Sequence, residues 1–573
     1  MDNQQIALVF RRVADLMEFK EENPFKIRSY RVAADTIEDY HEPLVALARQ
    51  GSKALQAIPG VGKTISANII ELVTTGSCSV YEQVKREVPE STLDLLQVNG
   101  IGMKTAQRLF RDYQISSLEQ LEAFALTGKL HIIAGISQKT VDRIIKSITR
   151  LKQTRELLLL HEAYNLFAVV EPELLAIDDV ESVILTGAAR RGQELIKSVE
   201  ILIIAANGGE VAQQLARLPG VKAVEALTPT RVDLIFHPSL RTRFELVEPA
   251  QWAVALVQTS SSSAHFQSLQ ELATAQGLRL EARAIYQRAG KRQQLADEAA
   301  LYEMLGLPLV APELRELPID KIDLSLSTRL IKMEDLRGDL HMHTIASDGN
   351  NTVREMAQAA QAAGLEYIAI TDHSKSSVIA NGLDERHLIA QMHEIDTINA
   401  QMDGLHILRG SEVDILSDGA LDFSPELLER LDFVIASVHS GFAQPSRRIT
   451  QRVLQAFETG LVDVFAHPTG RLLGRRPGYE IDLSRVIEAA QQHSVCLELN
   501  SNPYRLDLSA ENLRAAQEAG VRFIISTDAH SIEGMSARLY GIITARRAGL
   551  TCSDVLNTLP LAEFQHEIGA MAL

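Results

Sequence analysis

Histidines and carboxylates in the C-terminal third of this sequence recur at spacings that suit metal binding. His341 and His343 are two positions apart in an expected strand. Because successive side chains of a strand point to opposite faces, both imidazoles would lie on one face and could share a metal ion. A single histidine at a strand end is more often a structural residue than a ligand, so the prediction of a metal site depends on the whole set. The set comprises His341, His343, Asp372, His373, Glu412, His439, His467, Asp528 and His530.

The elements that must position these side chains are short apolar runs that end in polar residues. Residues 367–370 precede Asp372, and residues 433–438 precede His439. Helical segments separate such runs, and strands that alternate with helices predict parallel βα units closed as a barrel. The polar residues would then converge at the C-terminal mouth of the strands, where active sites of this architecture lie.

The chemistry of this set points to several metal ions. Six histidines and several carboxylates exceed what one ion can use, and the absence of thiols among them suits Zn²⁺, Mn²⁺ or Fe²⁺. Neighbouring ions of this kind generate hydroxide and stabilise the oxyanions of a phosphoester displacement. Arg471 and Arg475, in the loop after His467, could present guanidinium groups to a phosphate near the metals. A solvated basic loop explains these arginines equally well.

The motifs around these residues closely resemble those of PHP phosphoesterase domains. They are residues 338–343, 347–349, 371–374, 412–414, 437–440, 466–468 and 527–530. The resemblance implies three metal ions. One would be held by His341, His343, Glu412 and Asp528, a second by Glu412, His439 and His467, and a third by Asp348, His373 and His530. Catalytic roles are expected for His341, His343, Glu412, Asp528, Arg471 and Arg475.

The first 155 residues read as short amphipathic helices broken by glycine-rich turns, which predicts an all-α region. In these turns glycines bring backbone N–H groups to a helix N-terminus, a ready site for an anion. The residues concerned are Gly60, Gly62 and Lys63 in one turn and Gly100, Gly102 and Lys104 in another. Two such turns resemble paired helix-hairpin-helix modules, which hold the sugar–phosphate backbone without reading bases. A third copy, at residues 134–137, is degenerate.

Charge and cysteine content narrow the class of protein. The formal net charge is −17, but the first 155 residues carry +3 and the other 418 carry −20, so the acidity lies outside the expected DNA-binding region. Cys78, Cys496 and Cys552 lie far apart, which argues against disulfides and favours a reducing cytoplasm. No apolar run approaches the roughly 18 residues of a membrane span, so neither membrane insertion nor secretion is expected.

The β-branched runs between residues 183 and 236 suggest a small sheet. With the helical N-terminal region before this sheet and the PHP-like barrel after it, the chain resembles a bacterial family X DNA polymerase from end to end. The implied parts are a first helical module at 1–90, a second at 91–155, a palm-like nucleotidyltransferase domain at 156–240, a thumb-like domain at 241–318, a linker at 319–335 and the PHP barrel at 336–573. The stretch from Pro308 to Arg337, with three prolines and little periodicity, is typical of an ordered linker.

The palm-like domain departs from the pattern of that family. Its nucleotide-contacting motif resembles residues 186–192, and the expected contacts are Gly187, Arg190 and Arg191. Where the family has two aspartates on one strand face to bind two Mg²⁺ ions, this sequence has Ser198 and Glu200. A hydroxyl cannot replace a carboxylate on both metals, and we assign the third metal-binding position to Asp233. We therefore expect weak or absent Mg²⁺ binding and polymerase activity.

Two further departures point the same way. Residues 257–261 stand where the family has an aromatic pair followed by Thr-Gly-Ser, which helps to seat the nucleotide. Asn68 stands where related eukaryotic enzymes have the Schiff-base lysine of a lyase, so we expect no lyase activity.

The leading hypothesis is a DNA repair or end-processing enzyme, a metal-dependent 3′-5′ exonuclease acting on gapped, nicked or 3′-end-bearing DNA. The metals would be Mn²⁺ or Zn²⁺, with Fe²⁺ a further candidate. The alternatives are a gap-filling DNA polymerase with proofreading, a small-molecule phosphatase and a non-catalytic DNA scaffold. Binding of dNTPs stays open, and we expect a monomer.

Overall fold

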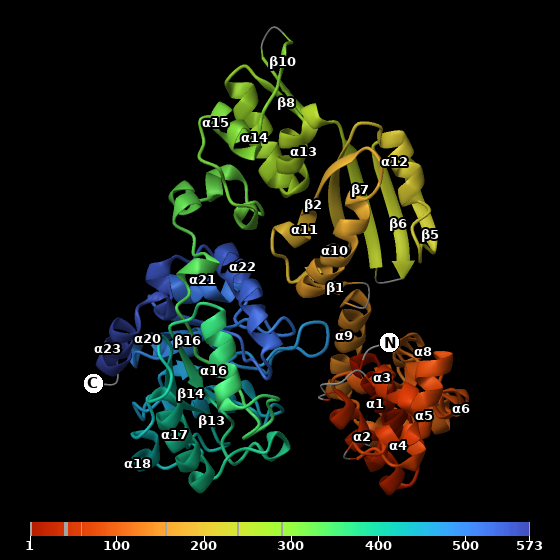
Figure 1. Cartoon of the computed structure of the whole chain (residues 1–573), viewed down its shortest axis with the longest axis vertical. Coiled ribbons are helices and arrows are strands. Elements are labelled where there is room, and N and C mark those ends of the chain that lie inside the picture. Colours follow the sequence, from red (N-terminus) through yellow and green to blue (C-terminus); the bar gives the residue numbers. More distant parts are fainter. Residues whose placement is uncertain are drawn as a thin grey trace. The chain divides into compact units, whose positions relative to one another are not determined.

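The computed structural model describes residues 3–38, 40, 44–58, 60–133, 136–154, 157–237, 240–287 and 290–571. Two compact units are present, Met1–Arg155 and Glu156–Leu573, and each is described by itself (Figure 1). Among the described residues, no helix is both long enough and apolar enough to cross a membrane.

The regular elements of the first unit, within its described residues, are all helices, as predicted. Its helices are α1 (Asn3–Phe19), α2 (Pro24–Glu38), α3 (Leu44–Gln50), α4 (Ser52–Leu55), α5 (Lys63–Thr75), α6 (Ser79–Glu87), α7 (Met103–Tyr113), α8 (Leu118–Leu126) and α9 (Gln138–Thr154), with 3₁₀ helices η1 (Glu90–Gln97) and η2 (Leu130–Ile132). Apolar side chains such as Phe10 of α1, Ile69 of α5 and Leu109 of α7 form its buried core, because each amphipathic helix must bury its apolar face against the others.

The second unit begins with a five-stranded sheet in the order β2-β4-β7-β6-β5. Its strands are β2 (Val180–Thr186), β4 (Val199–Ala205), β5 (Ala223–Thr228), β6 (Arg231–His237) and β7 (Leu240–Val247); β1 (Leu158–Leu159) and β3 (Leu195–Ile196) pair separately, and the helices are α10 (Leu160–Leu175), α11 (Gly187–Arg190) and α12 (Gly208–Leu215). β4 pairs antiparallel with β2 and parallel with β7. Its β-branched residues are almost wholly buried, as suits a central strand.

A small α/β part follows the sheet and packs around its own apolar cluster, which includes Val254, Phe266, Leu269 and Ile285. It comprises η3 (Pro249–Gln251), α13 (Trp252–Thr259), α14 (Ser263–Ala275), β8 (Arg279–Glu281), β9 (Ala284–Tyr286), β10 (Arg292–Gln293) and α15 (Glu298–Met304). The connection to the barrel is ordered, in four short 3₁₀ helices: η4 (Pro312–Leu314), η5 (Ile319–Lys321), η6 (Leu324–Thr328) and η7 (Met333–Asp335).

Seven parallel strands in sequential order form the C-terminal barrel. They are β11 (Gly338–Asp339), β12 (Tyr367–Ile370), β13 (His406–Asp414), β14 (Phe433–Ser437), β15 (Val464–Phe465), β16 (Cys496–Asn500) and β17 (Phe523–Ser526). A parallel bridge between Met342 and Ala529 joins the two ends of the sheet, so the barrel is nearly closed. β11 ends before His341 and His343, earlier than predicted. The bridge at Met342 nevertheless keeps this segment extended, and both histidines are fully buried.

Helices surround this barrel, as the alternation of strands and helices predicted. They are α16 (Val353–Ala362), α17 (Glu385–Asn399), α18 (Pro425–Leu428), α19 (Ser446–Phe457), α20 (Leu483–Gln492), α21 (Ala510–Glu518), α22 (Arg538–Ala548) and α23 (Leu561–Met571), with 3₁₀ turns η8 (Val378–Ala380), η9 (Glu533–Ala537), η10 (Cys552–Asp554) and η11 (Leu556–Thr558). Strands β12, β14, β16 and β17 are buried along their whole length, which explains why such strands read as continuous apolar runs rather than as alternating ones.

Candidate metal centre and nucleic-acid interface

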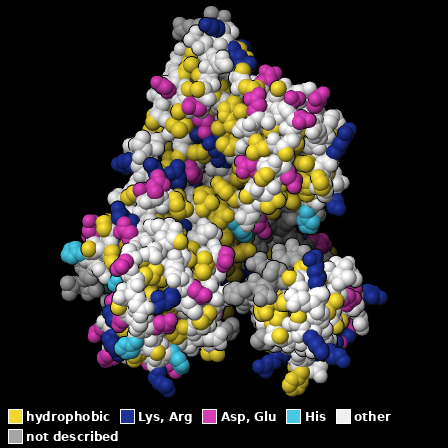
Figure 2. All heavy atoms as spheres, viewed as in Figure 1, with side chains coloured by type: hydrophobic (Ala, Val, Ile, Leu, Met, Phe, Trp, Pro, Cys, Tyr) yellow, Lys and Arg dark blue, Asp and Glu magenta, His cyan; other side chains and the backbone are white. Residues whose placement is uncertain are grey.

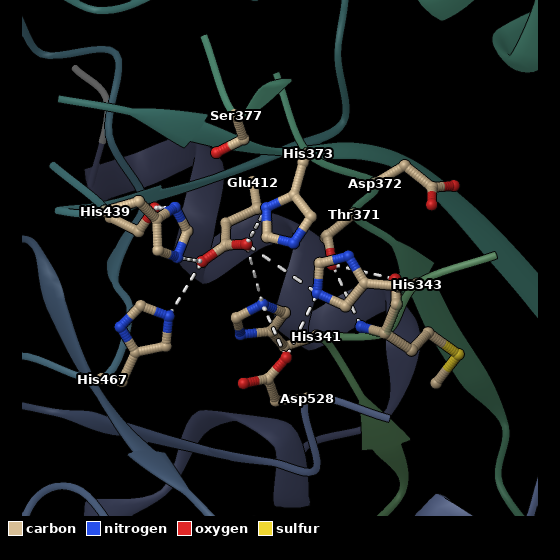
Figure 3. Close-up of polar contacts among 12 residues, drawn as sticks. His341, His343, Thr371, Asp372, His373, Ser377, Glu412, His439, His467 and Asp528 are labelled. Carbon is tan, nitrogen blue, oxygen red and sulfur yellow. Dashed lines mark hydrogen bonds and ion pairs between the residues drawn. The ribbon is translucent and has the colours of Figure 1, made fainter. Parts of the chain in front are cut away.

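Glu412 of β13 lies at the centre of the histidine and carboxylate cluster (Figure 3). Its Oε1 lies 2.9 Å from His467 Nε2 and 3.3 Å from His439 Nε2. Its Oε2 lies 2.7 Å from His373 Nδ1 and 3.6 Å from His341 Nε2. The surrounding histidines outweigh the cost of burying the charge and hold the pKa of Glu412 well below its usual range.

Two further groups complete the cluster. Asp528 Oδ1, beyond β17, lies 3.2 Å from His343 Nε2 and 3.6 Å from His341 Nε2. Asp348 Oδ1 lies 3.4 Å from His530 Nε2 and 3.6 Å from His373 Nε2. The structure therefore brings together the nine side chains that the resemblance implied as metal ligands. Three subsets have ligand atoms within 4.8 Å of one another: His343, Asp348, His373 and His530; His341, His343 and Asp528; and His373, Glu412 and His439.

The state of the ring nitrogens fits a metal centre. His341 Nε2, both ring nitrogens of His343 and His467 Nδ1 are buried without a hydrogen-bond partner. Burying such groups is costly unless something binds them. Burial, with the neighbouring His530 and His373, lowers the pKa of His343 to about 3, so this imidazole is neutral at pH 7, the form that binds metals. The residues present therefore fit bound metal ions.

A second layer of carboxylates orients the histidines. Asp414 Oδ1 lies 2.7 Å from His439 Nδ1, and Glu498 Oε1 lies 2.7 Å from His341 Nδ1. Each contact turns the Nε2 of its histidine toward the cluster, as carboxylates commonly do for metal-bound histidines. Glu498 lies on β16, and nothing in its local spacing marked it as part of the site. Asp372 is not in the cluster; it accepts hydrogen bonds from the Thr344 backbone and side chain.

The cluster opens into a cavity of about 550 Å³. Four carboxylates line it, those of Asp348, Glu412, Asp414 and Asp528. Among the described residues that line the cavity, Arg505 is the one lysine or arginine. Its Nε lies 3.4 Å from Asp528 Oδ2. The sequence did not predict this arginine, because it lies in a loop after β16 with no recognised spacing to the ligands.

Arg471 and Arg475, for which catalytic roles were predicted, are engaged elsewhere in this structure. Arg471 forms a two-point ion pair with Glu194, at 2.6 and 3.1 Å, so its guanidinium faces the palm-like domain instead of the cavity. Arg475 is exposed and lies over the ring of Tyr504, 5.0 Å from its centroid. Neither side chain lines the cavity.

Three charged residues lie in a row across neighbouring strands of the palm-like sheet. The neighbour of Glu200 on the adjacent strand β7 is Arg243, and Asp233 lies one strand further away, on β6. The guanidinium of Arg243 donates to Asp233 Oδ1 at 3.1 Å. Asp233, to which the third metal-binding position was assigned, is therefore separated from Glu200 by the cation of Arg243. Ser198 immediately precedes β4.

The expected nucleotide-contacting residues of the palm-like sheet are engaged within the protein. Arg190 pairs with Glu298 of α15 at 2.6 Å and donates to Ser260 Oγ at 2.8 Å. Arg191 pairs with Glu316. Gly187 has a φ of 65° and packs so closely on the Glu200 side chain that an added Cβ would lie 2.6 Å from its carboxyl carbon. Both arginines thus join the palm and thumb parts in this structure, whereas Gly187 packs within the palm.

In the first unit, the two glycine-rich turns lead directly into α5 and α7. Gly60 and Gly100 have φ values of 76° and 101°, which glycine adopts without strain. Gly62 and Gly102 are the N-caps, and no side chain caps either helix. Lys63 and Lys104, in the first turn of each helix, are exposed. Each turn therefore leaves backbone N–H groups and a lysine free for an anion. The degenerate third turn includes residues 134 and 135, which lie outside the described residues.

Asn68 of α5 is buried, and its Nδ2 donates to Tyr30 Oη at 2.8 Å. An amide in this buried hydrogen bond cannot serve as the amine nucleophile of a lyase.

Comparison with known protein families identifies four parts of this chain. The Helix-hairpin-helix domain family matches residues 1–78, the SAM-like Helix-hairpin-helix tandem family residues 92–150, the DNA polymerase beta thumb family residues 255–316 and the PHP domain family residues 339–502. The barrel region is 32% identical over 231 residues to a probable phosphatase of Acetivibrio thermocellus and 34% identical over 234 residues to one of Shewanella loihica. These alignments cover 38% and 39% of this chain and 90% of each relative.

One relative spans the whole length. The DNA polymerase/3′-5′ exonuclease PolX of Bacillus subtilis is 34% identical over 568 residues, which is 99% of both chains. Along this chain, the matched families follow one another in the order of the structure, from helix-hairpin-helix modules through a thumb to a PHP domain. The chain therefore belongs to the PolX family and carries a C-terminal PHP domain.

Proposed function

We propose that this protein is a metal-dependent 3′-5′ exonuclease that trims DNA ends during repair, and that its palm-like sheet does not synthesise DNA. The convergence of the predicted ligands around Glu412 carries the proposal. The 3′-5′ polarity is supported by the name of the full-length Bacillus subtilis relative. The cytoplasm remains the expected location, since all three cysteines are free.

The ligand geometry supports three metal ions, which we expect to be Mn²⁺ or Zn²⁺, with Fe²⁺ as a further candidate. One would be held by His341, His343, Glu412 and Asp528, one by Glu412, His439 and His467, and one by Asp348, His373 and His530. Bound there, the ions would supply Lewis-acid chemistry that activates water and offsets the charge of the phosphodiester. The donors are nitrogen and oxygen only, which suits these metals.

The state of the palm-like sheet supports the second half of the proposal. Two Mg²⁺ ions need several carboxylates turned toward one point. Here Glu200 faces Arg243 across the strand pair, and burial raises the pKa of Glu200, which disfavours its charged form. We therefore expect neither Mg²⁺ nor productive dNTP binding at this sheet.

End-labelled gapped duplexes with Mn²⁺ test the proposal. Wild-type protein should shorten a 5′-labelled primer stepwise from its 3′ end, added dNTPs should not lengthen it, and His341→Ala should leave it intact. Lengthening of the primer would instead show a gap-filling polymerase with proofreading. Release of the 5′ label as a single nucleotide would reverse the polarity.

A second candidate is a small-molecule phosphatase, favoured by the two probable phosphatases that match the barrel over 90% of their length. Parallel assays on the labelled duplex and on p-nitrophenyl phosphate distinguish the two. A kcat/KM for the monoester well above that for DNA would replace the exonuclease proposal.

Removing the two exposed lysines should weaken DNA binding. Figure 2 shows several Lys and Arg side chains on the visible face of the first unit, and Lys63 and Lys104 lie at its two helix N-termini. Lys63→Ala with Lys104→Ala should weaken binding to any sequence about tenfold and lower the slope of log K against log salt by about 2, since each phosphate contact contributes about 1. Fluorescence anisotropy over a salt series measures both.

A matched control is Lys321→Ala, because Lys321 is an exposed lysine of the linker that contacts Asp320. The DNA affinity and the salt slope of the Lys321→Ala variant should equal those of wild type. An unchanged slope in the double variant would show that the two turns do not contact phosphates.

A further inference from the structure

We propose that the palm-like domain is a working part of the phosphoesterase site: Glu194, just before β3, holds Arg471, which holds the loop that places Arg505 against the substrate phosphate. This inference rests on the proposed function, because it assigns a substrate contact to the same cavity. It gives the palm-like domain a role that does not depend on nucleotide binding.

Arg505 is placed to contact an anion in the cavity. Its side chain is 20% exposed, and its Nε faces Asp528 Oδ2 at 3.4 Å. No described residue hydrogen-bonds to its Nη groups, so the outer edge of the guanidinium remains available. A guanidinium can donate two parallel hydrogen bonds to a phosphate. In a cavity lined by four carboxylates, the guanidinium of Arg505 supplies a positive charge that can bind a phosphodiester.

The position of Arg505 depends on its loop, which runs from the end of β16 to α21. Arg471 Nε donates to the carbonyl oxygen of Arg505 at 2.9 Å, and Arg471 Nη2 donates to the carbonyl oxygen of Leu506. Leu506 has a φ of 42°, a backbone conformation that residues other than glycine rarely adopt. These two hydrogen bonds therefore hold a turn that the chain would not favour by itself.

Arg471 is in turn held by Glu194 of the palm-like domain. Glu194 Oε1 and Oε2 accept from Arg471 Nη2 and Nη1 at 2.6 and 3.1 Å, and the two side chains are only 17% and 18% exposed. The same loop meets the palm at two more points. The ring of Tyr504 packs edge-on against His161 of α10, 4.9 Å between centroids, and Leu506 belongs to the apolar cluster of the palm-like sheet.

The charges explain why Glu194 has this effect. A carboxylate paired with both outer nitrogens fixes the guanidinium plane of Arg471, and the fixed plane sets the directions of the remaining donors. With a glutamine at position 194 the charge is lost, and Arg471 can turn away from the two carbonyl groups. The expected result is a less ordered Arg505 with the metal ligands unchanged.

Hydrolysis of the diester bis-p-nitrophenyl phosphate by the full-length, metal-loaded protein tests the inference, with bound metal and Tm recorded for each variant. Arg505→Ala should lower kcat/KM about a hundredfold, as for loss of one anion-stabilising donor. Glu194→Gln should lower it about tenfold, as for loss of an outer positioning partner. Both should keep wild-type metal content and Tm. Arg505→Lys should recover part of the loss, because it keeps the charge.

The double variant separates positioning from general stability. If Glu194 acts through Arg505, Glu194→Gln should have no further effect on kcat/KM in the Arg505→Ala background. Glu225→Gln is the control, since Glu225 pairs with Arg241 at the exposed edge of the five-stranded sheet of the same palm-like domain; this variant should behave as wild type. Additive losses in the double variant, or an unchanged kcat/KM in Arg505→Ala, would overturn the inference. So would loss of metal in both Arg505 variants, which would mean that Arg505 supports Asp528 instead of the substrate.

Failure of the exonuclease proposal would look different. In that case wild type would leave DNA ends intact while still hydrolysing the small diester, and the comparison of variants would remain valid.

Discussion

Glu412→Gln should abolish strand cleavage and remove metal ions from the barrel. Glu412 is buried, and its two oxygens lie within 4 Å of His341, His343, His373, His439 and His467. A glutamine of the same size turns an NH₂ group toward these ligands and removes the charge that balances the metals. We expect a fall in kcat/KM of at least about 10³-fold, because a charge-stabilising group at the reacting centre is lost, and fewer bound metal ions per chain by elemental analysis.

The matched control is Glu366→Gln on the same barrel. Glu366 pairs with Arg337 at the surface, and both side chains are more than 40% exposed, so the pair should contribute little. Cleavage and metal content should stay at the wild-type level. Full activity in Glu412→Gln would mean that the reacting centre lies elsewhere, and full metal content with lost activity would restrict Glu412 to the reaction itself.

The barrel and its ligands could be predicted because strand direction alone brings them together. Every parallel strand of a barrel ends at the same mouth, so a polar residue after each apolar run had only one place to lie. The periodicity did not locate the end of β11, where two residues pair with β12. The ligand positions still held, because the bridge at Met342 continues the same extended path.

The errors arose where position depends on packing between distant segments. Arg471 follows a ligand closely in sequence, but its guanidinium is captured by Glu194, 277 residues away. Arg505 enters the cavity from a loop whose path is set by the palm. For the palm itself, spacing along the chain predicted strands without their order: β7 lies between β4 and β6, so Arg243 and not Asp233 is the neighbour of Glu200. No local pattern reveals such an order.

The palm-like sheet should incorporate no nucleotide on a gapped duplex with Mg²⁺ or Mn²⁺. The assay is best done in the Glu412→Gln background, so that strand trimming cannot conceal extension. Polymerase chemistry on metals needs adjacent carboxylates, and here the acid of β4 faces the guanidinium of Arg243, which is committed to Asp233. Incorporation should lie at the enzyme-free background, and calorimetry should detect no Mg²⁺ binding in this background.

The strand order also predicts which substitutions should restore a metal site in the palm-like sheet. In the Glu412→Gln background, Ser198→Asp with Glu200→Asp places two carboxylates on β4 or beside it. Arg243 still lies opposite them, and the positive charge of Arg243 should still exclude Mg²⁺. Adding Arg243→Asp replaces that cation by a third carboxylate on the neighbouring strand and should give Mg²⁺ binding measurable by calorimetry. Mg²⁺ binding by the two-site variant would show that Arg243 does not block the site. Incorporation by the unaltered palm would show that Ser198, Glu200 and Arg243 are compatible with synthesis, and that the barrel then serves a polymerase.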